Sequence, residues 1–196
     1  MSAPEAVFPQ SPADAGPDGL RRLFRRHAAA VAVVTTTYRG DPVGLLVTSL
    51  ASVSASPALI SFNVSRTSSS WPALREARHL GVHLLAHDQA QLAGRFARKG
   101  AERFSAPTSW QAGPHRTPVI DGVAARSIAE VEQRVPAGDH VIVVARLLSV
   151  DTLDGVAPLL HHDGAYHLAV PVPVPPAAPS PAPVDASRLT VVRDQT

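Results

Sequence analysis

The chain has 196 residues, 45% of them hydrophobic, which suits one folded domain with a tail. Aromatic residues make up only 5%, so the core is expected to consist mainly of Val, Leu and Ala. The formal net charge of +2 gives no large basic field, which argues against nucleic acid or an anionic membrane as a partner. The sequence contains no cysteine, which excludes disulfides, thiolate metal sites and thiol catalysis.

Both ends of the chain differ from its middle in composition. Residues 1–17 are rich in Pro, Ala and Asp and are expected to be disordered, and they lack the basic-then-apolar order of a secretory signal. No apolar run approaches the roughly 20 residues of a membrane span. We therefore expect a cytoplasmic protein with one folded domain at 18–170, followed by a proline-rich tail at 171–196.

The first part of the domain is predicted to form one helix and then strands. Asp18 is placed to cap an amphipathic helix that begins at Gly19 and contains LRRLFRRHAA, whose arginines indicate a solvated face rather than a nucleic-acid site. β-branched residues predict strands at 31–38, 43–50 and 58–64. An Arg-Gly-Asp-Pro turn joins the first two of these strands into a hairpin.

Two helix starts follow along the chain. We expect a helix from Ser70 to about Arg78, capped by Ser70 and with a proline in its first turn, and then a strand at 80–86. Asp88 is placed to cap a second helix, which Gly100 ends.

The rest of the domain is predicted to be mostly strand. Residues 102–118 carry several Gly and Pro residues and are expected to be irregular. Strands are predicted at 122–135 and 140–150, and a last hairpin at 158–162 and 165–169. Six or more strands, joined mostly by short turns and without regular strand–helix alternation, favour an antiparallel barrel or sandwich.

Several catalytic motifs are absent from the sequence. It contains no G-x-G-x-x-G, no Walker A loop, no G-x-S-x-G and no H-E-x-x-H. His161 and His162 are neighbours on a predicted strand, so their side chains would point to opposite faces and would not chelate a metal together. We therefore predict no metal site.

Two clusters of small hydroxyl residues lie between the predicted strands. The first, TSLASVS at 48–54, could offer backbone N–H groups and a flat apolar floor to a flavin ring, and the alternative is an ordinary edge strand. The second cluster runs from Arg66 to Ser70, directly before a predicted helix. Free N–H groups and a positive dipole end there favour a phosphate, and the alternative is a flexible Ser loop with one helix cap.

A third feature is the turn Ala137-Gly138-Asp139-His140, which leads into the strand at 140–150. Such a turn would place the imidazole of His140 at the mouth of a barrel. The alternative is a histidine on the surface without a role in catalysis.

With these features in this order, the chain resembles the flavin reductase-like, FMN-binding split-barrel family. Its members are short-chain NAD(P)H:flavin oxidoreductases that serve two-component monooxygenases. The resemblance runs from about Leu20 to Leu168. It rests on the segment SVS-x-x-P, the block D-Q-x-x-L-x-x-x-F-x-x-K-G-x-x-R-F and the Gly-Asp-His turn, at spacings like those of the family.

The resemblance implies a mainly β fold, a six-stranded antiparallel Greek-key split barrel that forms a homodimer with flavin near the subunit interface. The cofactor would be FMN or FAD, with NADH or NADPH as the hydride donor. A hydride would pass from nicotinamide C4 to flavin N5. The reduced flavin would then diffuse to a partner flavin-dependent monooxygenase.

The resemblance also implies roles for particular residues. The flavin ring and ribityl chain would be lined by Val47, Thr48, Ser49, Ser52 and Ser54. The phosphate would be held by Thr67, Ser68 and Ser70, with Arg66 nearby. The cofactor would be covered by Arg103 and Phe104. His140 would be the catalytic residue, near the ring where the nicotinamide arrives, and Tyr166 would lie near the same mouth.

Several positions depart from the family pattern. Thr48 stands where the family often has Asn, and Leu46, Leu50 and His83 stand where it commonly has Thr, Phe and Asn. The last three bear most on flavin binding. A second hypothesis is therefore a barrel that binds flavin or another small molecule without reductase turnover. A third is an oxidoreductase with tightly held FMN that acts on its own organic substrate.

Overall fold

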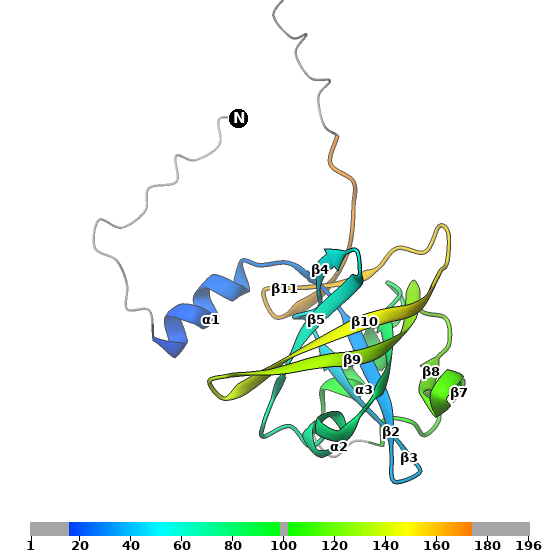
Figure 1. The fold of residues 1–196 in the computed structure, drawn as a ribbon. Helices are drawn as coiled ribbons and strands as arrows, with labels where there is room; N and C mark the ends of the chain where they lie inside the picture. Colours follow the sequence, from blue (N-terminus) through cyan, green and yellow to red (C-terminus); the bar gives the residue numbers. More distant parts are fainter. Residues whose placement is uncertain (1–15, 99–101, 174–196) are drawn as a thin grey trace, which may run out of the picture.

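The computed structural model describes residues 16–98 and 102–173. Its centre is a seven-stranded antiparallel sheet in the order β3-β2-β6-β9-β10-β5-β4, which curls into a barrel (Figure 1). Two smaller antiparallel sheets accompany it, in the orders β1-β11-β12 and β7-β8. The two edge strands of the main sheet, β3 and β4, are consecutive in sequence, so the seam of the barrel lies where one strand leads into the next.

The described helices are α1 (Pro17–Arg25), α2 (Trp71–Glu76), α3 (Ala90–Ala97) and the short 3-10 helix η1 (Pro114–Arg116). The strands of the main sheet are β2 (Ala32–Tyr38), β3 (Asp41–Val47), β4 (Ala51–Ala55), β5 (Ala58–Ser65), β6 (His79–Leu84), β9 (Ala125–Ala137) and β10 (His140–Thr152). The smaller sheets comprise β1 (Ala29–Ala30), β11 (Leu159–His162), β12 (Ala165–Leu168), β7 (Trp110–Ala112) and β8 (Pro118–Ile120).

The mainly β, antiparallel split barrel expected from the sequence is confirmed. The main sheet has one strand more than the six expected, because β4 pairs with β5 at its edge. The last predicted hairpin is also confirmed, as β11 and β12. The predicted N-terminal disorder falls almost entirely outside the described residues, as do Gly100 and most of the proline-rich tail.

Some predicted boundaries are wrong. Helix α1 has Gly16 rather than Asp18 at its N-cap, with Pro17 in the first turn, where a missing N–H costs little. Asp18 instead forms an ion pair with Arg21, at 2.6 Å. Helix α3 is preceded by Gln89 rather than Asp88 at the N-cap position.

Two strand predictions also need correction. The strand predicted to reach residue 50 ends at Val47. The segment 102–118, expected to be irregular, contains β7 and η1 and leads into β8. Local sequence does not predict this hairpin, because its strands have only three residues each. They pack on the main sheet, so their stability depends on distant contacts.

The core has two layers, because strand β2 is buried on both faces. Ala32 and Val34 pack inside the barrel with Phe62, Leu80 and Val143, and we call this cluster the barrel interior. Alternate residues of a strand point to opposite faces. Val31 and Val33 therefore pack outside the barrel with Leu85, Phe96 and Leu159, and we call this cluster the outer layer.

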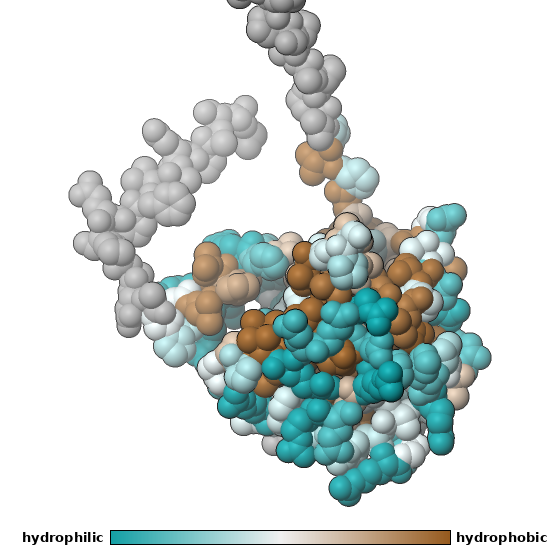
Figure 2. Space-filling view, viewed as in Figure 1, coloured by the Kyte–Doolittle hydropathy of each residue, from teal (hydrophilic) through white to brown (hydrophobic). Residues whose placement is uncertain are grey.

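One face of the molecule carries exposed apolar side chains over α1 and strands β4, β9 and β10 (Figure 2). Helix α1 stands beside the barrel (Figure 1), and none of its residues is buried. Leu20, Leu23 and Phe24 of α1 are more than half exposed. None of the helices within the described ranges has the length and apolar character needed to span a membrane.

The tight packing around Gly81 gives a first prediction. A Cβ at this position would collide with Thr35 Oγ1 and would lie 2.9 Å from Pro118 O, so an added methyl group has no room. We expect Gly81→Ala to lower the free energy of unfolding by about 1–3 kcal/mol, measured by urea denaturation. Gly94→Ala is the matched control, because a Cβ there meets nothing within 4 Å. Alanine is more favourable than glycine inside a helix, so this change should raise the free energy of unfolding by about 0.5–1 kcal/mol. Equal effects of the two changes would contradict the packing described here.

Candidate functional site

A buried hydrogen-bonded node joins three distant segments beside the barrel seam. Ser70 Oγ donates to the carbonyl oxygen of Gly44 at 2.9 Å, and Ser70 is only 1% exposed. The guanidinium of Arg103 donates through Nη1 to the same carbonyl at 2.6 Å and to Ser70 Oγ at 3.0 Å. Its Nη2 donates to the carbonyl of Arg98 at 3.0 Å. The loop after α3 is thus tied to β3 and to the start of α2.

A cavity of about 420 Å³ opens beside this node. It is lined by Pro42, Val43, Gly44, Ser69, Ser70, Glu102, Arg103, Phe104 and Ser105. Within the described structure, Arg103 Nε is buried without a hydrogen-bond partner. Burial lowers the pKa of Arg103, but a guanidinium remains charged at neutral pH. Glu102 contributes an exposed carboxylate to the lining, whereas the hydrogen bonds of Arg103 go to neutral oxygens. A half-buried guanidinium with one buried, unpaired N–H fits an anionic ligand group such as a phosphate.

Aromatic contacts hold the wall of the cavity in place. Phe104 packs edge-on against Phe96 and Trp110, with both pairs of ring centroids 5.4 Å apart. Trp110 Nε1 donates to the carbonyl of Phe104 at 2.9 Å. A Cβ on Gly44 would lie 2.7 Å from Phe96 Cε1 and 3.2 Å from Phe104 Cζ. Only glycine therefore lets this strand lie so close under the two rings.

The second hydroxyl cluster forms a turn linked by its own hydrogen bonds. Thr67 N–H donates to Ser65 Oγ at 3.2 Å, and Ser70 N–H donates to Ser68 Oγ at 3.3 Å. The predicted side-chain cap by Ser70 is wrong: Ser70 occupies the N-cap position of α2, but its hydroxyl turns to Gly44 instead. Arg66 and Thr67 are exposed to solvent.

The Gly-Asp-His turn lies directly beside this cluster. His140 pairs with Ser65 across strands β10 and β5, and Arg66 N–H donates to the carbonyl of Asp139 at 3.1 Å. His140 Nδ1 lies 2.8 Å from Asp139 Oδ1. This hydrogen bond, with the charge of a protonated imidazole, lowers the pKa of Asp139. The carboxylate thus orients a half-exposed imidazole at the edge of the second cluster.

The first hydroxyl cluster spans the seam between β3 and β4. Thr48 and Ser52 are exposed, and Ser49 Oγ accepts a hydrogen bond from Asn63 N–H at 2.9 Å. Val47 is 5% exposed and points into the barrel interior, so only its backbone can reach a ligand. Strand β4 is an edge strand with a register shift between Ser52 and Ser54. An edge leaves part of its backbone N–H groups unpaired.

Strand β5 connects the two clusters. Asn63 contacts Ser49 of the first cluster, and Ser65 contacts Thr67 of the second. The structure thus brings most of the predicted site residues to one side of the barrel seam. Tyr166 is the exception: it packs against His161, with ring centroids 5.9 Å apart, and against the outer layer. Burial there raises the pKa of Tyr166.

The structure shows where three of the departures from the family pattern lie. Leu46 packs against the outer layer, and Leu50 packs against the barrel interior. Each leucine therefore adds to a hydrophobic cluster. His83 is fully buried in β6 and lies on the outer face of the sheet, away from the barrel interior.

Two residues of the candidate site stand out in the local sequence. Gly44 lies inside an otherwise apolar strand, and a glycine there often marks a close approach to other groups. Asn63 interrupts the apolar run ALISFNV and supplies the N–H that binds Ser49. Nothing in the local sequence shows that Ser70 and Arg103 meet, because 33 positions separate them.

The fold defines the protein as an antiparallel split barrel with a candidate site along its seam. Residues 24–169 match the model of the "Flavin reductase like domain" family, and the chain belongs to this family. It is 40% identical over 156 residues to the NADH:FMN oxidoreductase of Rhodococcus erythropolis, covering 78% of this chain and 81% of the relative.

Two further relatives are covered by this chain to different extents. The chain is 36% identical over 148 residues to the reductase component of the flavin-dependent trigonelline monooxygenase of Acinetobacter baylyi, which covers 75% of this chain but 47% of that protein. The crystal structure of a flavin reductase domain protein from Arthrobacter sp. superposes with a TM-score of 0.76 at 39% identity. The superposition covers 80% of this chain and 98% of that one.

The role of Ser70 in the node gives a second prediction. Ser70→Ala leaves the buried carbonyl of Gly44 and one N–H of Arg103 with fewer partners. We expect it to lower the free energy of unfolding by about 1–3 kcal/mol, measured by urea denaturation. Ser69→Ala, at the exposed neighbouring hydroxyl, is the control and should change stability by less than about 0.5 kcal/mol. If Ser70→Ala were as neutral as the control, the node would not be a structural link.

Proposed function

We propose that the protein is an NADH-dependent FMN reductase that supplies reduced flavin to a flavin-dependent monooxygenase. The observation that carries this proposal is the half-buried guanidinium of Arg103, with its unpaired Nε, beside a cavity and a hydroxyl turn, in a chain 40% identical to an NADH:FMN oxidoreductase. We propose FMN rather than FAD, and NADH rather than NADPH, because the same relative is an NADH:FMN oxidoreductase. When both are bound, a hydride passes from nicotinamide C4 to flavin N5.

The residues of the node would bind the flavin phosphate. Arg103 supplies the charge, and Nε is the N–H it still has free of a partner within the described structure. Thr67, Ser68 and the exposed Arg66 supply further donors from the neighbouring turn. Ser70 would act indirectly, because its hydroxyl holds Arg103 and Gly44 in place.

The seam between β3 and β4 would bind the flavin ring. Small side chains at Thr48, Ser49, Ser52 and Ser54 let a flat ligand come close to the backbone. Backbone N–H groups there would stabilise negative charge that develops on the pyrimidine side of the ring. Phe104, held by two aromatic neighbours, would cover the cofactor from the other side of the cavity.

His140 would orient the nicotinamide. Its Nδ1 contact with Asp139 fixes the plane of the ring and leaves Nε2 to hydrogen-bond with a ligand. Distance and orientation are the main contribution a protein makes to such a transfer. His140 need not donate or accept a proton in the reaction.

The alternative hypothesis, a barrel that binds a ligand without reductase turnover, depends on Leu46, Leu50 and His83. Since Leu46 and Leu50 both pack against hydrophobic clusters, these two residues do not favour the alternative. The alternative of a tightly bound flavin with a separate organic substrate is distinguished by experiment, because it predicts NADH oxidation that needs that substrate rather than added flavin.

The third prediction tests the function directly. Purified protein is titrated with FMN and followed by its absorbance spectrum, and NADH is then added with and without free FMN. We expect NADH oxidation that depends on added FMN. A folded protein that oxidises no NADH above background with FMN or FAD would overturn the proposal.

A variant pair sharpens the same assay. Because His140 would contact only the nicotinamide, His140→Ala should raise the KM for NADH about tenfold and leave FMN affinity unchanged. His87→Ala, at an exposed histidine before α3, is the control and should change neither quantity.

We also propose that the protein is a homodimer. The apolar face over α1, β4, β9 and β10 is larger than single exposed residues explain, and such faces mark protein interfaces (Figure 2). Helix α1 has an apolar side with no buried residue, so a second copy would cover what one chain leaves exposed.

The fourth prediction follows from this face. Light scattering should give twice the 20.6 kDa mass of one chain. Replacing Leu23 and Phe24 together by Glu should shift the mass toward one chain, because two charges would be buried in the interface. Val172→Glu is the control, because Val172 is exposed and lies outside this face, and it should leave the mass unchanged. A single-chain mass for the unchanged protein would contradict the dimer.

A further inference from the structure

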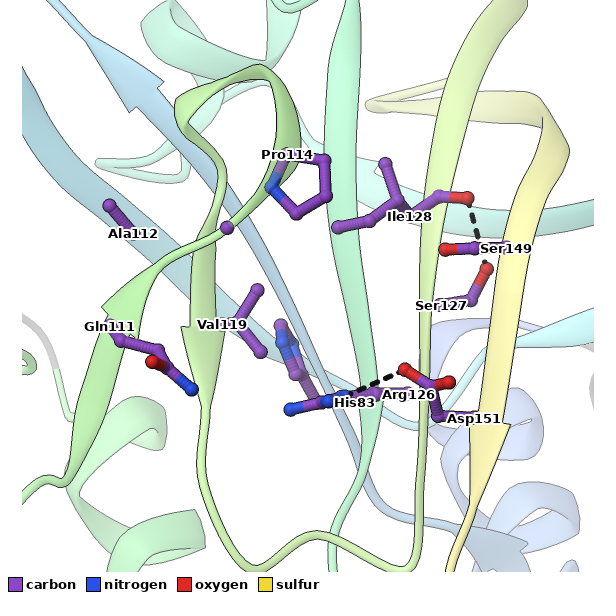
Figure 3. A pocket seen from close by; sticks show the side chains of 11 residues that line it. His83, Gln111, Ala112, Pro114, Val119, Arg126, Ser127, Ile128, Ser149 and Asp151 are labelled. Atoms are coloured by element: carbon purple, nitrogen blue, oxygen red, sulfur yellow. Dashed lines mark hydrogen bonds and ion pairs between the residues drawn. The ribbon is translucent and has the colours of Figure 1, made fainter.

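A second cavity, of about 320 Å³, lies on the outer face of the main sheet (Figure 3). It is enclosed between the β7–β8 hairpin and strands β6, β9 and β10. Its main lining residues are His83, Gln111, Val119, Arg126, Ser149 and Asp151. It shares no lining residue with the cavity beside Arg103, so it is separate from the flavin cradle.

His83 forms the buried end of this cavity. Its Nδ1 lies 3.1 Å from the carbonyl oxygen of Val33. A carbonyl can only accept, so Nδ1 carries the proton and Nε2 is left as an acceptor. Burial lowers the pKa of His83 to about 4, so the ring is neutral at physiological pH. Residue His83 has 0% exposure, and its Nε2 has no hydrogen-bond partner in the described structure.

An acceptor buried in this way costs free energy until a donor reaches it. Within the described structure, no protein donor lies within hydrogen-bonding distance of Nε2, and this includes the N–H groups of Arg126 beside the ring. Gly81 lies beneath His83 Cε1 and has no side chain, and Val119 is apolar. An O–H or N–H group of a molecule that enters the cavity would supply the donor.

Arg126 supplies charged hydrogen-bond donors in the same cavity, whereas His83 supplies an acceptor. Its guanidinium lies beside the imidazole of His83 (Figure 3), and its charge is one cause of the lowered pKa of His83. Within the described structure, Nε of Arg126 donates to Asp151 Oδ2 at 3.0 Å. That single bond uses one edge of the guanidinium, which leaves its terminal amino groups for an acceptor. A guanidinium binds carboxylates well because its N–H groups match both oxygens.

The walls between these groups are partly apolar. Val119 of β8 and Pro114 of η1 face Ile128 of β9 across the cavity (Figure 3). A volume of this size falls at the lower end of pockets that take small organic ligands. A single aromatic ring fits such a space better than a nucleotide does.

We propose that this cavity is a second binding site, for an aromatic hydroxy acid. The hydroxyl of the ligand donates to His83 Nε2, its carboxylate accepts from Arg126, and its ring packs between Val119 and Ile128. His83, which departs from the family pattern, is then the residue that selects a ligand with a hydroxyl group.

The fifth prediction uses the three isomers of hydroxybenzoate as probes and benzoate as the matched probe without a hydroxyl. Protein labelled with ¹⁵N-histidine is titrated with each probe and followed by NMR. At least one isomer should bind about tenfold more tightly than benzoate, since it adds a hydrogen bond to a buried acceptor. The Nε2 resonance of His83 should shift, and saturating FMN should leave the affinity unchanged.

Variants separate the two contacts. With His83→Phe, hydroxybenzoate and benzoate should bind equally, because the acceptor is gone and a buried ring is kept. With Arg126→Gln, both probes should bind about tenfold more weakly. Arg146→Gln is the control, since Arg146 pairs with Glu130 and Glu132 on β9 and does not line the cavity.

Clear outcomes would overturn the proposal. One is that none of the isomers binds more tightly than benzoate to the unchanged protein, a measurement that needs no variant to fold. Another is binding that leaves the His83 resonance in place. A third is competition between hydroxybenzoate and FMN, which would move the probe to the flavin cradle.

Discussion

The burial of strand β2 on both of its faces is the constraint on which the rest of the structure depends. Residues Val31–Val34 have no exposed surface. One set of side chains fills the barrel interior, and the other set needs a second hydrophobic layer outside the barrel. That layer recruits α3 and the small sheet β1-β11-β12. Two of its aromatic members, Phe96 and Phe104, then lie over Gly44, and Phe104 lines the cavity beside Arg103.

The contact between Arg103 and Ser70 connects this packing to function. The same guanidinium fixes the loop after α3, holds the carbonyl of Gly44 and keeps one buried N–H without a partner. A buried N–H of a guanidinium rarely stays without an acceptor unless a ligand supplies one. The stability of this part of the molecule and its affinity for a flavin phosphate should therefore depend on the same residues.

The two cavities differ in the chemistry that they leave unsatisfied. Beside Arg103 the unpaired group is a donor with positive charge, which suits a phosphate. Beside His83 it is a neutral acceptor next to the partly balanced charge of Arg126. Both lie outside the barrel interior, which is filled by apolar side chains. The two cavities thus lie where loops and hairpins cover the sheet.

The sequence by itself determined the family, most strands and the order of the two hydroxyl clusters and the Gly-Asp-His turn, because these depend on local pattern and on motif spacing. It also located the hairpin of β11 and β12 through its Asp-Gly turn. Only the tertiary structure decided that Ser70 bonds to Gly44 rather than capping its helix, that Tyr166 packs on the outer layer, and that β7 and β8 enclose His83. Each of these outcomes depends on contacts between residues far apart in the chain, and no local pattern encodes which distant partner a side chain will meet.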